Sequence, residues 1–324
     1  MKADEQTIQA FRKKLCDEGF QDLEEKLVMG EVLKSHTSFR VGGPAQIYAE
    51  PGDVREVIAL VQSAKAAGLP YFLMGNGSNL VVSDKGIDGL VIRLGDKFSD
   101  IRLEEDPEDP DFMYMHACAG ALLTKASSVA MKNALTGLEF ASGIPGSIGG
   151  AVFMNAGAYD HDMSEVVESA LCITEDGESY TVTRGNFAYG YRTSCFMEKG
   201  GIVLSVVLKL KHGNQEEIES QIRTYTEKRT KSQPLNLPSA GSMFKRPVGF
   251  YTGALIQEAG LKGFTVGGAQ ISEKHAGFVV NIGNATADDI DQLTKKVQAI
   301  IKEKNGVTLE REVRFVGVGY TQQE

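Results

Sequence analysis

Residues 137–159 read GLEFASGIPGSIGGAVFMNAGAY, a stretch that is rich in glycine and almost free of charge. Glycine costs backbone entropy on folding, so this density indicates either a flexible linker or a segment whose backbone a ligand approaches closely. The stretch follows a predicted helix over 121–135 and precedes a predicted β-rich region over 165–210, so it lies inside one folded unit. We therefore expect a ligand cradle here and not a linker.

Hydrophobic periodicity along the rest of the chain predicts mixed helices and strands, so the expected fold class is α+β. An amphipathic helix is expected over 7–27, Asp53 is placed to cap a helix that ends near Gly68, and Thr286 is placed to cap a helix over 286–306. The other expected elements are strands over 70–75, 88–94, 112–119, 201–210, 275–282 and 307–318, and helices over 214–231 and 251–261.

Composition limits the functions that need to be considered. The 324 residues carry a net charge of −9 and are 42% hydrophobic, which suits a globular protein and disfavours a general nucleic-acid binder. Between Arg223 and Arg246 the balance is reversed, with six basic residues against one acidic residue, Glu227. This local excess indicates either an anionic small ligand or a solvated basic helix end.

Targeting and metal-binding signals are missing from the sequence. The opening MKADEQTIQAFRKK has mixed charge without an apolar signal core, and no apolar run is long enough to cross a bilayer. We therefore expect a cytoplasmic protein without a membrane partner or an obligate protein partner. The cysteines form no CxxC pair and the histidines no HExxH motif, so no metal site is expected.

A second glycine-rich loop, GNGSN at 75–79, follows a predicted strand. A dinucleotide-binding turn needs GxGxxG opening a helix, whereas this loop leads into an apolar run over 80–82 and another strand. No GKS or GKT follows any glycine cluster, which excludes a Walker A loop. The loops at 75–79 and 143–150 instead offer adjacent backbone N–H groups of the kind that bind pyrophosphate. Together they point to a dinucleotide cofactor.

Six motifs occur in order along residues 30–317: SFRVGGPA (38–45), GNGSNLVVSDKG (75–86), the stretch 137–159, YGYRTS (189–194), PSAGSMFKRP (238–247) and LEREVRF (309–315). This set resembles the UDP-N-acetylenolpyruvoylglucosamine reductases, the MurB family of bacterial cell-wall synthesis. The resemblance implies an FAD-binding fold of the vanillyl-alcohol-oxidase (PCMH) type. In that fold FAD lies between two subdomains, here 1–95 and 96–212, and a C-terminal α+β domain, here 213–324, covers the substrate. The last strand is a candidate to return to the first subdomain.

The resemblance also implies a reaction and its participants. NADPH reduces FAD, and FAD then reduces UDP-N-acetylglucosamine enolpyruvate to UDP-N-acetylmuramate. Only about thirty residues separate the strand over 201–210 from the motif at 238–247, which fits the shorter, type II subclass. Two other functions stay open: an oxygen-using oxidase of the same flavin fold, and a non-catalytic nucleotide-binding relative.

By the same resemblance, the catalytic residues are Arg192, Ser242 and Glu312. Cofactor contacts are expected from Arg40, Gly42, Gly75, Asn76, Gly77, Ser78, Asn79, Ile144, Pro145, Gly146, Ser147, Gly149, Gly150, Asn155, Ala156, Gly157, Ala158 and Arg229. The substrate diphosphate is expected on Lys231, Lys245 and Arg246. Ser232 stands where many members have Lys, and Arg246 where many have Asn. Tyr159, Tyr189 and Tyr251 are the candidates for an aromatic side chain that covers the substrate.

The catalytic residue types suit this chemistry. Hydride delivery to an enol ether carbon leaves negative charge on the neighbouring carbon, and the fixed fork of Arg192 can hold the pyruvyl carboxylate while charge accumulates. Ser242 can donate a proton to so basic a carbon if its hydroxyl is held nearby. Glu312 is a candidate for a carboxylic acid whose pKa is raised by burial, and Glu310, on the same strand face, is its control. Without the family, each residue also has an ordinary explanation as a surface, loop or solvated strand residue.

Overall fold

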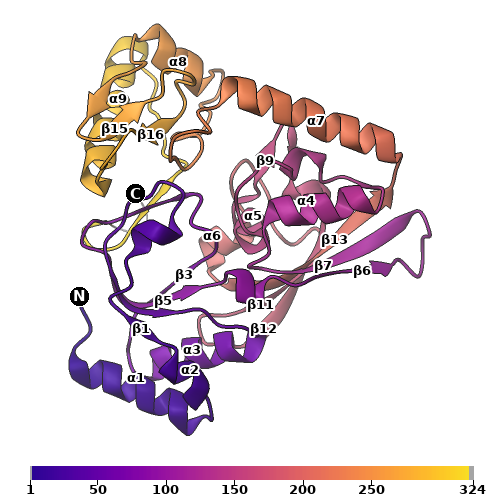
Figure 1. Cartoon of the computed structure of the whole chain (residues 1–324), viewed down its shortest axis with the longest axis vertical. Helices are drawn as coiled ribbons and strands as arrows, with labels where there is room; N and C mark the ends of the chain where they lie inside the picture. The colour runs from indigo at the N-terminus through magenta and orange to yellow at the C-terminus, as the bar shows by residue number, and fades with distance from the viewer. Residues whose placement is uncertain (1, 321–324) are drawn as a thin grey trace.

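The computed structural model describes residues 2–320. Residues 1 and 321–324, the outer ends of the predicted ranges 1–95 and 213–324, lie outside the described residues. Three groups of elements follow one another along the chain, and the colours of Figure 1 help to find them: indigo to purple in the N-terminal group, magenta to orange in the middle group, and orange to yellow in the C-terminal group.

The N-terminal group is a four-stranded sheet with helices packed on it. The strand order is β1 (Val28–Met29), β2 (Ala45–Ala49), β5 (Ile87–Arg93) and β3 (Tyr71–Met74). Strand β5 is parallel to both β2 and β3, whereas β1 is antiparallel to β2. Helix α3 (Val54–Ala66) connects β2 to β3, because parallel strands need a crossover connection. This helix packs against α1 (Glu5–Asp17).

Two helix predictions for this group have different outcomes. The Asp53 cap is confirmed, since its side chain accepts a hydrogen bond from the Glu56 N–H (2.9 Å). The single helix over 7–27 is wrong. Gly19 adopts φ +89 between α1 and the short α2 (Gln21–Glu25), and this left-handed conformation ends the first helix.

The middle group is built on a six-stranded antiparallel sheet. Its order is β12 (Ser179–Thr183), β11 (Val167–Ile173), β13 (Ile202–His212), β7 (Phe112–Cys118) and β6 (Ile101–Glu105), with β8 (Leu135–Thr136) paired to the end of β13. The β-rich region predicted over 165–210 is confirmed. Helices α4 (Leu123–Lys132) and α5 (Ile148–Met154) belong to this group, and α5 packs on β13 and β7. Side chains of both sheets, Ile47 and Val206 among them, share one core.

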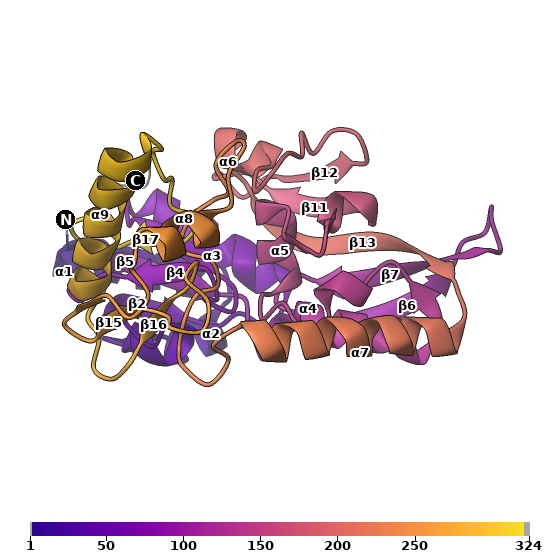
Figure 2. The same ribbon diagram turned by 90° about the horizontal axis from the view of Figure 1, so that it is seen from above.

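Helix α7 (Gln215–Ser232) runs along the middle group, as the view from above in Figure 2 shows. Its buried Tyr225 belongs to the same core as the two sheets, and the helix packs on α4. The predicted range 213–324 assigned this helix to the C-terminal domain. Its packing places it with residues 96–212.

The C-terminal group contains α8 (Thr252–Glu258), α9 (Ala287–Asn305) and the antiparallel sheet of β14 (Thr265–Val266), β15 (Ala269–Ile271) and β16 (Val279–Asn281). The Thr286 cap of α9 is confirmed, since its hydroxyl accepts from the Asp289 N–H (3.0 Å). The strand expected over 275–282 is β16, which is shorter.

The C-terminal group is tied to the N-terminal group by a strand and a cap. Strand β17 (Arg314–Val316) pairs in parallel with β4 (Leu80–Val82). Asp84, just after β4, accepts hydrogen bonds from the backbone N–H groups of Ala287 (2.9 Å) and Asp288 (3.0 Å) at the start of α9. The strand expected over 307–318 is confined to β17, since residues before it form only an isolated bridge between Phe244 and Arg311.

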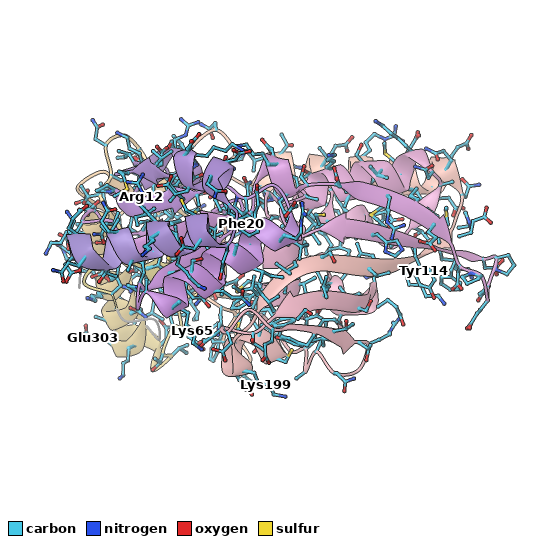
Figure 3. The ribbon with its side chains drawn as sticks, turned by 90° about the horizontal axis from the view of Figure 1, so that it is seen from below. Arg12, Phe20, Lys65, Tyr114, Lys199 and Glu303 are labelled. Carbon is cyan, nitrogen blue, oxygen red and sulfur yellow. The ribbon has the colours of Figure 1, made fainter. Side chains whose placement is uncertain are left out.

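The remaining elements are short: β9 (Gly157–Ala158), β10 (His161–Asp162), α6 (Cys195–Lys199) and the 3-10 helices Leu33–His36, Asp96–Phe98, Glu139–Ala141 and Met163–Glu165. Figure 3, seen from below, shows the side chains on the face formed by the N-terminal helices, where Arg12 of α1 pairs with Glu24 of α2. Within residues 2–320, no helix combines the length and apolarity that a bilayer crossing needs.

Candidate active site

The two glycine loops pack against each other. Asn76 Nδ2 donates a hydrogen bond to the Pro145 carbonyl (2.6 Å), and a Cβ on Gly75 would lie 2.0 Å from Ser147 Oγ. The loop 75–79 joins β3 to β4 without a helix, so the exclusion of a dinucleotide-binding turn is confirmed. Gly77 has φ +60, and a Cβ there would lie 2.1 Å from the His36 carbonyl oxygen. Glycine is therefore required at this turn by both conformation and space.

A cavity of about 920 Å³, called here the larger cavity, opens beside these loops. Its lining includes sixteen of the cofactor residues predicted from the sequence: Arg40, Gly75, Asn76, Gly77, Ser78, Asn79, Ile144, Pro145, Gly146, Ser147, Gly149, Gly150, Ala156, Gly157, Ala158 and Arg229. The structure thus brings both glycine loops and the end of α7 to one space.

Two predicted cofactor residues, Gly42 and Asn155, do not line this cavity. Gly42 adopts φ +136 and packs its Cα against Val82, where a Cβ would lie 2.9 Å from the valine Cβ. Asn155 ends α5 in the left-handed conformation, and its side chain donates to the Gly190 carbonyl (3.0 Å) and accepts from the Ser164 N–H (3.0 Å). Both residues hold loops in place in this structure, and the cofactor contact expected from them stays a prediction.

The cavity also has lining residues that the sequence reasoning missed. The segment 235–241, Phe153 of α5 and Arg314 of β17 all contribute. Arg314 could have been found, because the alternation that relates Glu310 to Glu312 places Arg314 next on the same face.

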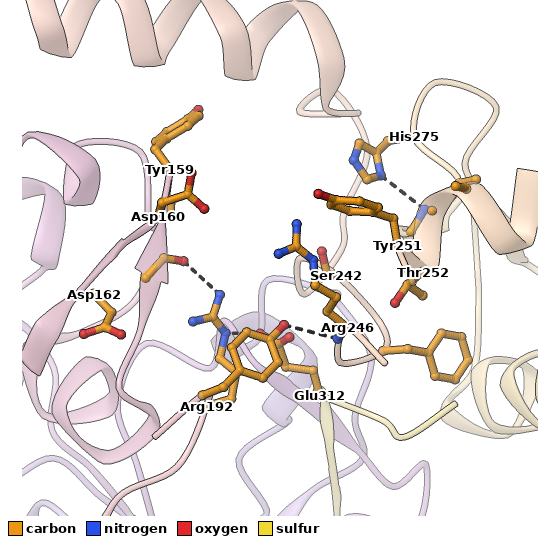
Figure 4. Close-up of a pocket in the computed structure, with 18 of the residues that line it drawn as sticks. Tyr159, Asp160, Asp162, Arg192, Ser242, Arg246, Tyr251, Thr252, His275 and Glu312 are labelled. Carbon is orange, nitrogen blue, oxygen red and sulfur yellow. Dashed lines mark hydrogen bonds and ion pairs between the residues drawn. The ribbon is translucent and has the colours of Figure 1, made fainter. Parts of the chain in front are cut away.

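A second cavity of about 760 Å³, the smaller cavity, lies between the middle and C-terminal groups (Figure 4). It is lined by aromatic, cationic and acidic side chains, including Tyr159, Asp160, Asp162, Tyr191, Arg246, Tyr251, Lys274 and His275. Five residues line both cavities: Gly157, Ala158, Arg192, Ser242 and Glu312. The three predicted catalytic residues therefore lie on the wall common to the two spaces.

Arg192 and Glu312 form an ion pair on this wall, with Arg192 Nε 2.7 Å from Glu312 Oε1. Arg192 Nη2 donates to the Gly157 carbonyl (2.8 Å) and Nη1 to the Asn155 carbonyl (3.4 Å). The backbone of Arg192 has φ +54, a left-handed conformation that is rare for residues other than glycine. Where such residues do occur, they are frequently found at functional sites. The guanidinium is thus held from three sides.

Burial raises the pKa of the Glu312 carboxyl above its ordinary value, while the positive charges of Arg192 and Lys245 partly oppose the shift. Only 15% of the Glu312 side chain is exposed, against 71% for Glu310, which pairs with Lys245. Glu310, the control expected from the sequence, is therefore a solvated carboxylate, whereas Glu312 faces the cavities.

Ser242 is exposed to both cavities. Its backbone forms an isolated antiparallel bridge with Phe278, and Gly241 before it adopts φ +79. Within residues 2–320 its hydroxyl has no hydrogen-bond partner. The hydroxyl is free to meet a bound ligand.

The predicted substrate residues are not brought together. Arg246 lines the smaller cavity, with its guanidinium 4.2 Å from the centroid of the Tyr251 ring. Lys245 pairs with Glu310, Lys231 is exposed near the end of α7, and neither lines a cavity. The direct diphosphate contacts predicted for Lys231 and Lys245 therefore have no support in this geometry.

Of the three tyrosines that were candidates to cover the substrate, two line a cavity and one does not. Tyr159 and Tyr251 line the smaller cavity, as does Tyr191, which was not a candidate. Tyr189 lines neither cavity and stacks on Phe187, with ring centroids 4.9 Å apart. His275 is an additional lining residue, and burial lowers its pKa.

The residues of the larger cavity fit a flavin dinucleotide. The loop 75–79 presents backbone N–H groups in a compact turn, and Ile144, Pro145 and Phe153 offer apolar surface to a planar ring. Burial lowers the pKa of Arg229, which has no ion-pair partner within the described residues. An anionic ligand would compensate this charge.

Comparison with known proteins agrees with a flavin-binding fold. Residues 45–183 match an FAD binding domain, and residues 233–316 match the C-terminal domain of UDP-N-acetylenolpyruvoylglucosamine reductase. Fold and site thus define an α+β flavoprotein oxidoreductase, and the predicted FAD-binding fold class is confirmed.

Relatives at higher similarity identify the family. UDP-N-acetylenolpyruvoylglucosamine reductase of Clostridium tetani is 46% identical over 90% of this chain and 93% of its own length, and that of Agathobacter rectalis is 48% identical over 90% and 94%. The crystal structure of the enzyme from Thermus caldophilus superposes with a TM-score of 0.74 at 36% identity, covering 90% of this chain and 98% of that one. The chain belongs to the UDP-N-acetylenolpyruvoylglucosamine reductase family, as its motifs predicted.

Proposed function

We propose that this protein uses FAD and NADPH to reduce UDP-N-acetylglucosamine enolpyruvate to UDP-N-acetylmuramate, a step of peptidoglycan precursor synthesis in the cytoplasm. The observation that carries this proposal is the wall shared by the two cavities, where Arg192, Ser242 and Glu312 lie. A reaction between a cofactor in one cavity and a substrate in the other needs its polar groups on that wall.

The larger cavity is the proposed FAD site, with loops 75–79 and 144–150 and Arg229 as its main contacts. When bound there, FAD supplies a hydride that originates from NADPH and ends on the enolpyruvyl group. The glycines allow the backbone to approach the cofactor closely, and the apolar lining excludes water from its ring.

Arg192 is the proposed binding group for the substrate carboxylate. A guanidinium has five N–H donors, and three are engaged by Glu312, Gly157 and Asn155. Two donors remain for a carboxylate, and the permanent positive charge stabilises negative charge as it develops next to it. The three existing hydrogen bonds fix the orientation before the substrate binds.

Ser242 and Glu312 are the proposed acids. Among the described residues the Ser242 hydroxyl has no hydrogen-bond partner to hold its proton, so it can donate that proton to the carbon next to the one that receives hydride. Burial raises the pKa of Glu312 against the opposing charge of Arg192, and the proposed acid is the protonated form of this carboxyl. In that form Oε1 still accepts from Arg192 Nε, while the other oxygen can donate a hydrogen bond to the enolic oxygen atoms.

The smaller cavity is the proposed site of the sugar nucleotide. Arg246 stacks on the Tyr251 ring and has no carboxylate partner within residues 2–320, so its positive charge is available to a diphosphate. Lys274 lies on the same wall, where its ammonium group donates to the Thr230 carbonyl (2.7 Å).

The direct test is NADPH oxidation by the purified, FAD-loaded protein. We expect rapid oxidation when UDP-N-acetylglucosamine enolpyruvate is added, and formation of UDP-N-acetylmuramate in equal amount. Equal slow rates with and without the enolpyruvyl sugar would show that the proposed function is wrong. Flavin that stays attached after denaturation would instead favour an oxidase of the same fold.

A further inference from the structure

Strand β6 (Ile101–Glu105) is an edge strand of the six-stranded sheet in the middle group. Its sequence is IRLEE, and it pairs with β7 along one side (Figure 1). Within residues 2–320, no other strand pairs with it. The free edge of a sheet presents N–H and C=O groups that a further strand can bind. The side chains of β6 decide whether the edge accepts such a strand or repels it.

The hydrogen bonds to β7 fix which backbone groups of β6 face the free edge. The Cys118 N–H donates to the Asp100 carbonyl (2.9 Å) before the strand, and the Asp106 N–H donates to the Phe112 carbonyl (3.3 Å) after it. The register between these two bonds is regular. Since bonded and non-bonded residues alternate in an antiparallel pair, the even-numbered residues of β6 bond to β7. The odd-numbered residues therefore direct their N–H and C=O groups toward the free edge.

The side chains of β6 are complementary to those of a second β6 that runs in the opposite direction. Antiparallel pairing of two copies about Leu103 places Arg102 opposite the partner's Glu104. A two-fold axis repeats each contact, so Glu104 lies opposite the partner's Arg102. Charges of one sign along an edge would repel another copy, whereas this edge carries one charge of each sign at the positions that meet.

The backbone supports the same register. Pairing about Leu103 sets odd-numbered residues opposite odd-numbered residues, so Leu103 exchanges hydrogen bonds with the partner's Leu103, and Ile101 with the partner's Glu105. Arg102 and Glu104 then fall in the non-hydrogen-bonded pairs, whose Cα atoms are about 4.5 Å apart and whose side chains approach most closely. The charged pairs thus take the positions where cross-strand contact is best.

Other registers fail on one of these two conditions. A shift by one residue sets odd-numbered residues opposite even-numbered ones, so the outward backbone groups no longer match. A shift by two residues sets Arg102 opposite the partner's Arg102, or Glu104 opposite the partner's Glu104, and like charges then repel. The pairing also ends with the strand, because the next pair outward would set Asp100 against the partner's Asp106.

The charged side chains of β6 are available for a new contact. The side chains of Arg102 and Glu104 are 70% and 55% exposed, and within one chain they approach to 3.3 Å (Arg102 Nη1 to Glu104 Oε2). Glu104 Oε2 also lies 3.1 Å from His116 Nε2. Exposed pairs of this kind contribute little to stability, so exchanging them for pairs across an interface costs little. The net charge of −9 per chain opposes association, but salt screens it beyond about 8 Å at physiological ionic strength.

We propose that two copies of this chain associate through the free edges of β6, so that the sheets of both middle groups form one continuous antiparallel sheet. The contact is short and the dimer is correspondingly weak, so its population depends on protein concentration. No residue of β6 lines either cavity, and the proposal does not depend on the proposed function.

The test is sedimentation equilibrium of the FAD-loaded protein at physiological ionic strength over a range of concentrations. The average mass should rise with concentration toward twice that of one chain. Arg102→Glu and Glu104→Arg, made singly, should each raise the dissociation constant of the dimer about tenfold or more, because like charges then face each other across the axis. The double variant exchanges the two signs and should restore the original dissociation constant.

Arg55→Glu is the matched control, because Arg55 is an exposed arginine of α3 that pairs with Asp53. It should leave the dissociation constant unchanged. Leu103→Pro removes one outward N–H without a partner in β7, and it should weaken the dimer while thermal melting shows a folded protein.

A chain that stays monomeric at every concentration would overturn the proposal. A dimer that is indifferent to both single charge reversals would overturn it too, as would a double variant that fails to restore association. All of these variants should keep the NADPH oxidation rate of the parent protein. A dimer with the expected response that does not reduce the enolpyruvyl sugar would support this inference while refuting the proposed function.

Discussion

Arg192 and Glu312 lie 120 positions apart in the sequence, yet Arg192 Nε is 2.7 Å from Glu312 Oε1 at the wall between the two cavities. The pair joins the loop before α6 to the segment before β17, so it connects the middle and C-terminal groups at the site itself. Removing one member of a partly buried pair leaves the other uncompensated. Each residue should therefore respond to substitution in a way that reports its own role.

Arg192→Lys should slow reoxidation of the reduced flavin by the enolpyruvyl sugar about 10²–10³-fold, the cost typical of losing one preorganised electrostatic contact. A lysine ammonium cannot reproduce the fork that contacts Glu312 and Gly157 together. Stopped-flow absorbance separates this step from flavin bleaching by NADPH, which should keep its rate. Arg184→Lys, a change at an exposed arginine paired with Glu168, is the control and should alter neither rate. Equal losses in both steps would contradict the assignment.

Glu312→Gln should change the pH dependence of the same reoxidation step. Since burial raises the pKa of Glu312, its protonated form persists to higher pH than for an ordinary glutamic acid, and the rate should fall as pH rises through that raised pKa. Glutamine cannot ionise, so the variant should be slower, and its rate should lose this limb of the profile. Glu310→Gln, at the exposed carboxylate that pairs with Lys245, should retain the full profile. A limb that survives in Glu312→Gln belongs to another group.

Ser242→Ala should separate the two half-reactions most clearly. Loss of a proton donor lowers a rate about 10²–10⁴-fold, so reoxidation by the sugar should slow by this order while NADPH still bleaches the flavin normally. Ser232→Ala, whose hydroxyl donates to the Lys228 carbonyl outside both cavities, is the matched control. If both half-reactions slow equally in Ser242→Ala, Ser242 is not the proton donor.

Gly77→Ala should weaken FAD binding at least about tenfold. The left-handed conformation costs an L-residue roughly 1–2 kcal/mol, and a methyl group here would also displace the His36 carbonyl, 2.1 Å from the new carbon. Gly68→Ala has the same conformational problem, φ +68, but open space around the new methyl group. It should lower thermal stability slightly and leave the dissociation constant of FAD, measured by flavin fluorescence, unchanged. Similar affinities in the two variants would exclude a cofactor role for the turn.

Arg246→Gln should raise the KM for the enolpyruvyl sugar about tenfold without changing NADPH-driven flavin reduction, because hydrogen bonds to charged groups contribute roughly 1.5–3 kcal/mol. Lys231→Gln is the comparison, since Lys231 is exposed outside both cavities. Steady-state kinetics should show no change for Lys231→Gln. A larger effect at Lys231 than at Arg246 would restore the diphosphate contact expected from the sequence.

Local signals predicted much of the fold. The caps at Asp53 and Thr286 and the strands over 165–210 depend on neighbouring residues, so they could be seen in the sequence. The failures have local causes as well. The helix over 7–27 is interrupted at Gly19, and the strand expected over 307–318 pairs only where β4 offers it an edge.

The sequence predicted which residues belong to the candidate site, but it did not predict which of them contact one another or line a cavity. Family motifs located Arg192, Ser242 and Glu312, whereas Gly42, Asn155, Lys231 and Lys245 matched the pattern without lining the cavities they were assigned to. A motif records which residues recur and does not tell a contact residue from one that holds a loop. Asn155, for example, positions the chain through Gly190 and Ser164.

By itself, the sequence determined the family, and it predicted the glycine-rich segment 137–159 as a ligand site and Arg192, Ser242 and Glu312 as the catalytic residues, because these inferences depend on residue types and short-range spacing. Only the tertiary structure decided that the cradle closes against the loop 75–79, and that Arg192 meets Glu312 on a wall between two cavities. Within residues 2–320, it also left Arg229 and Arg314 without carboxylate partners. Burial and charge compensation depend on which distant segments pack together, and that information exists only once the chain has folded.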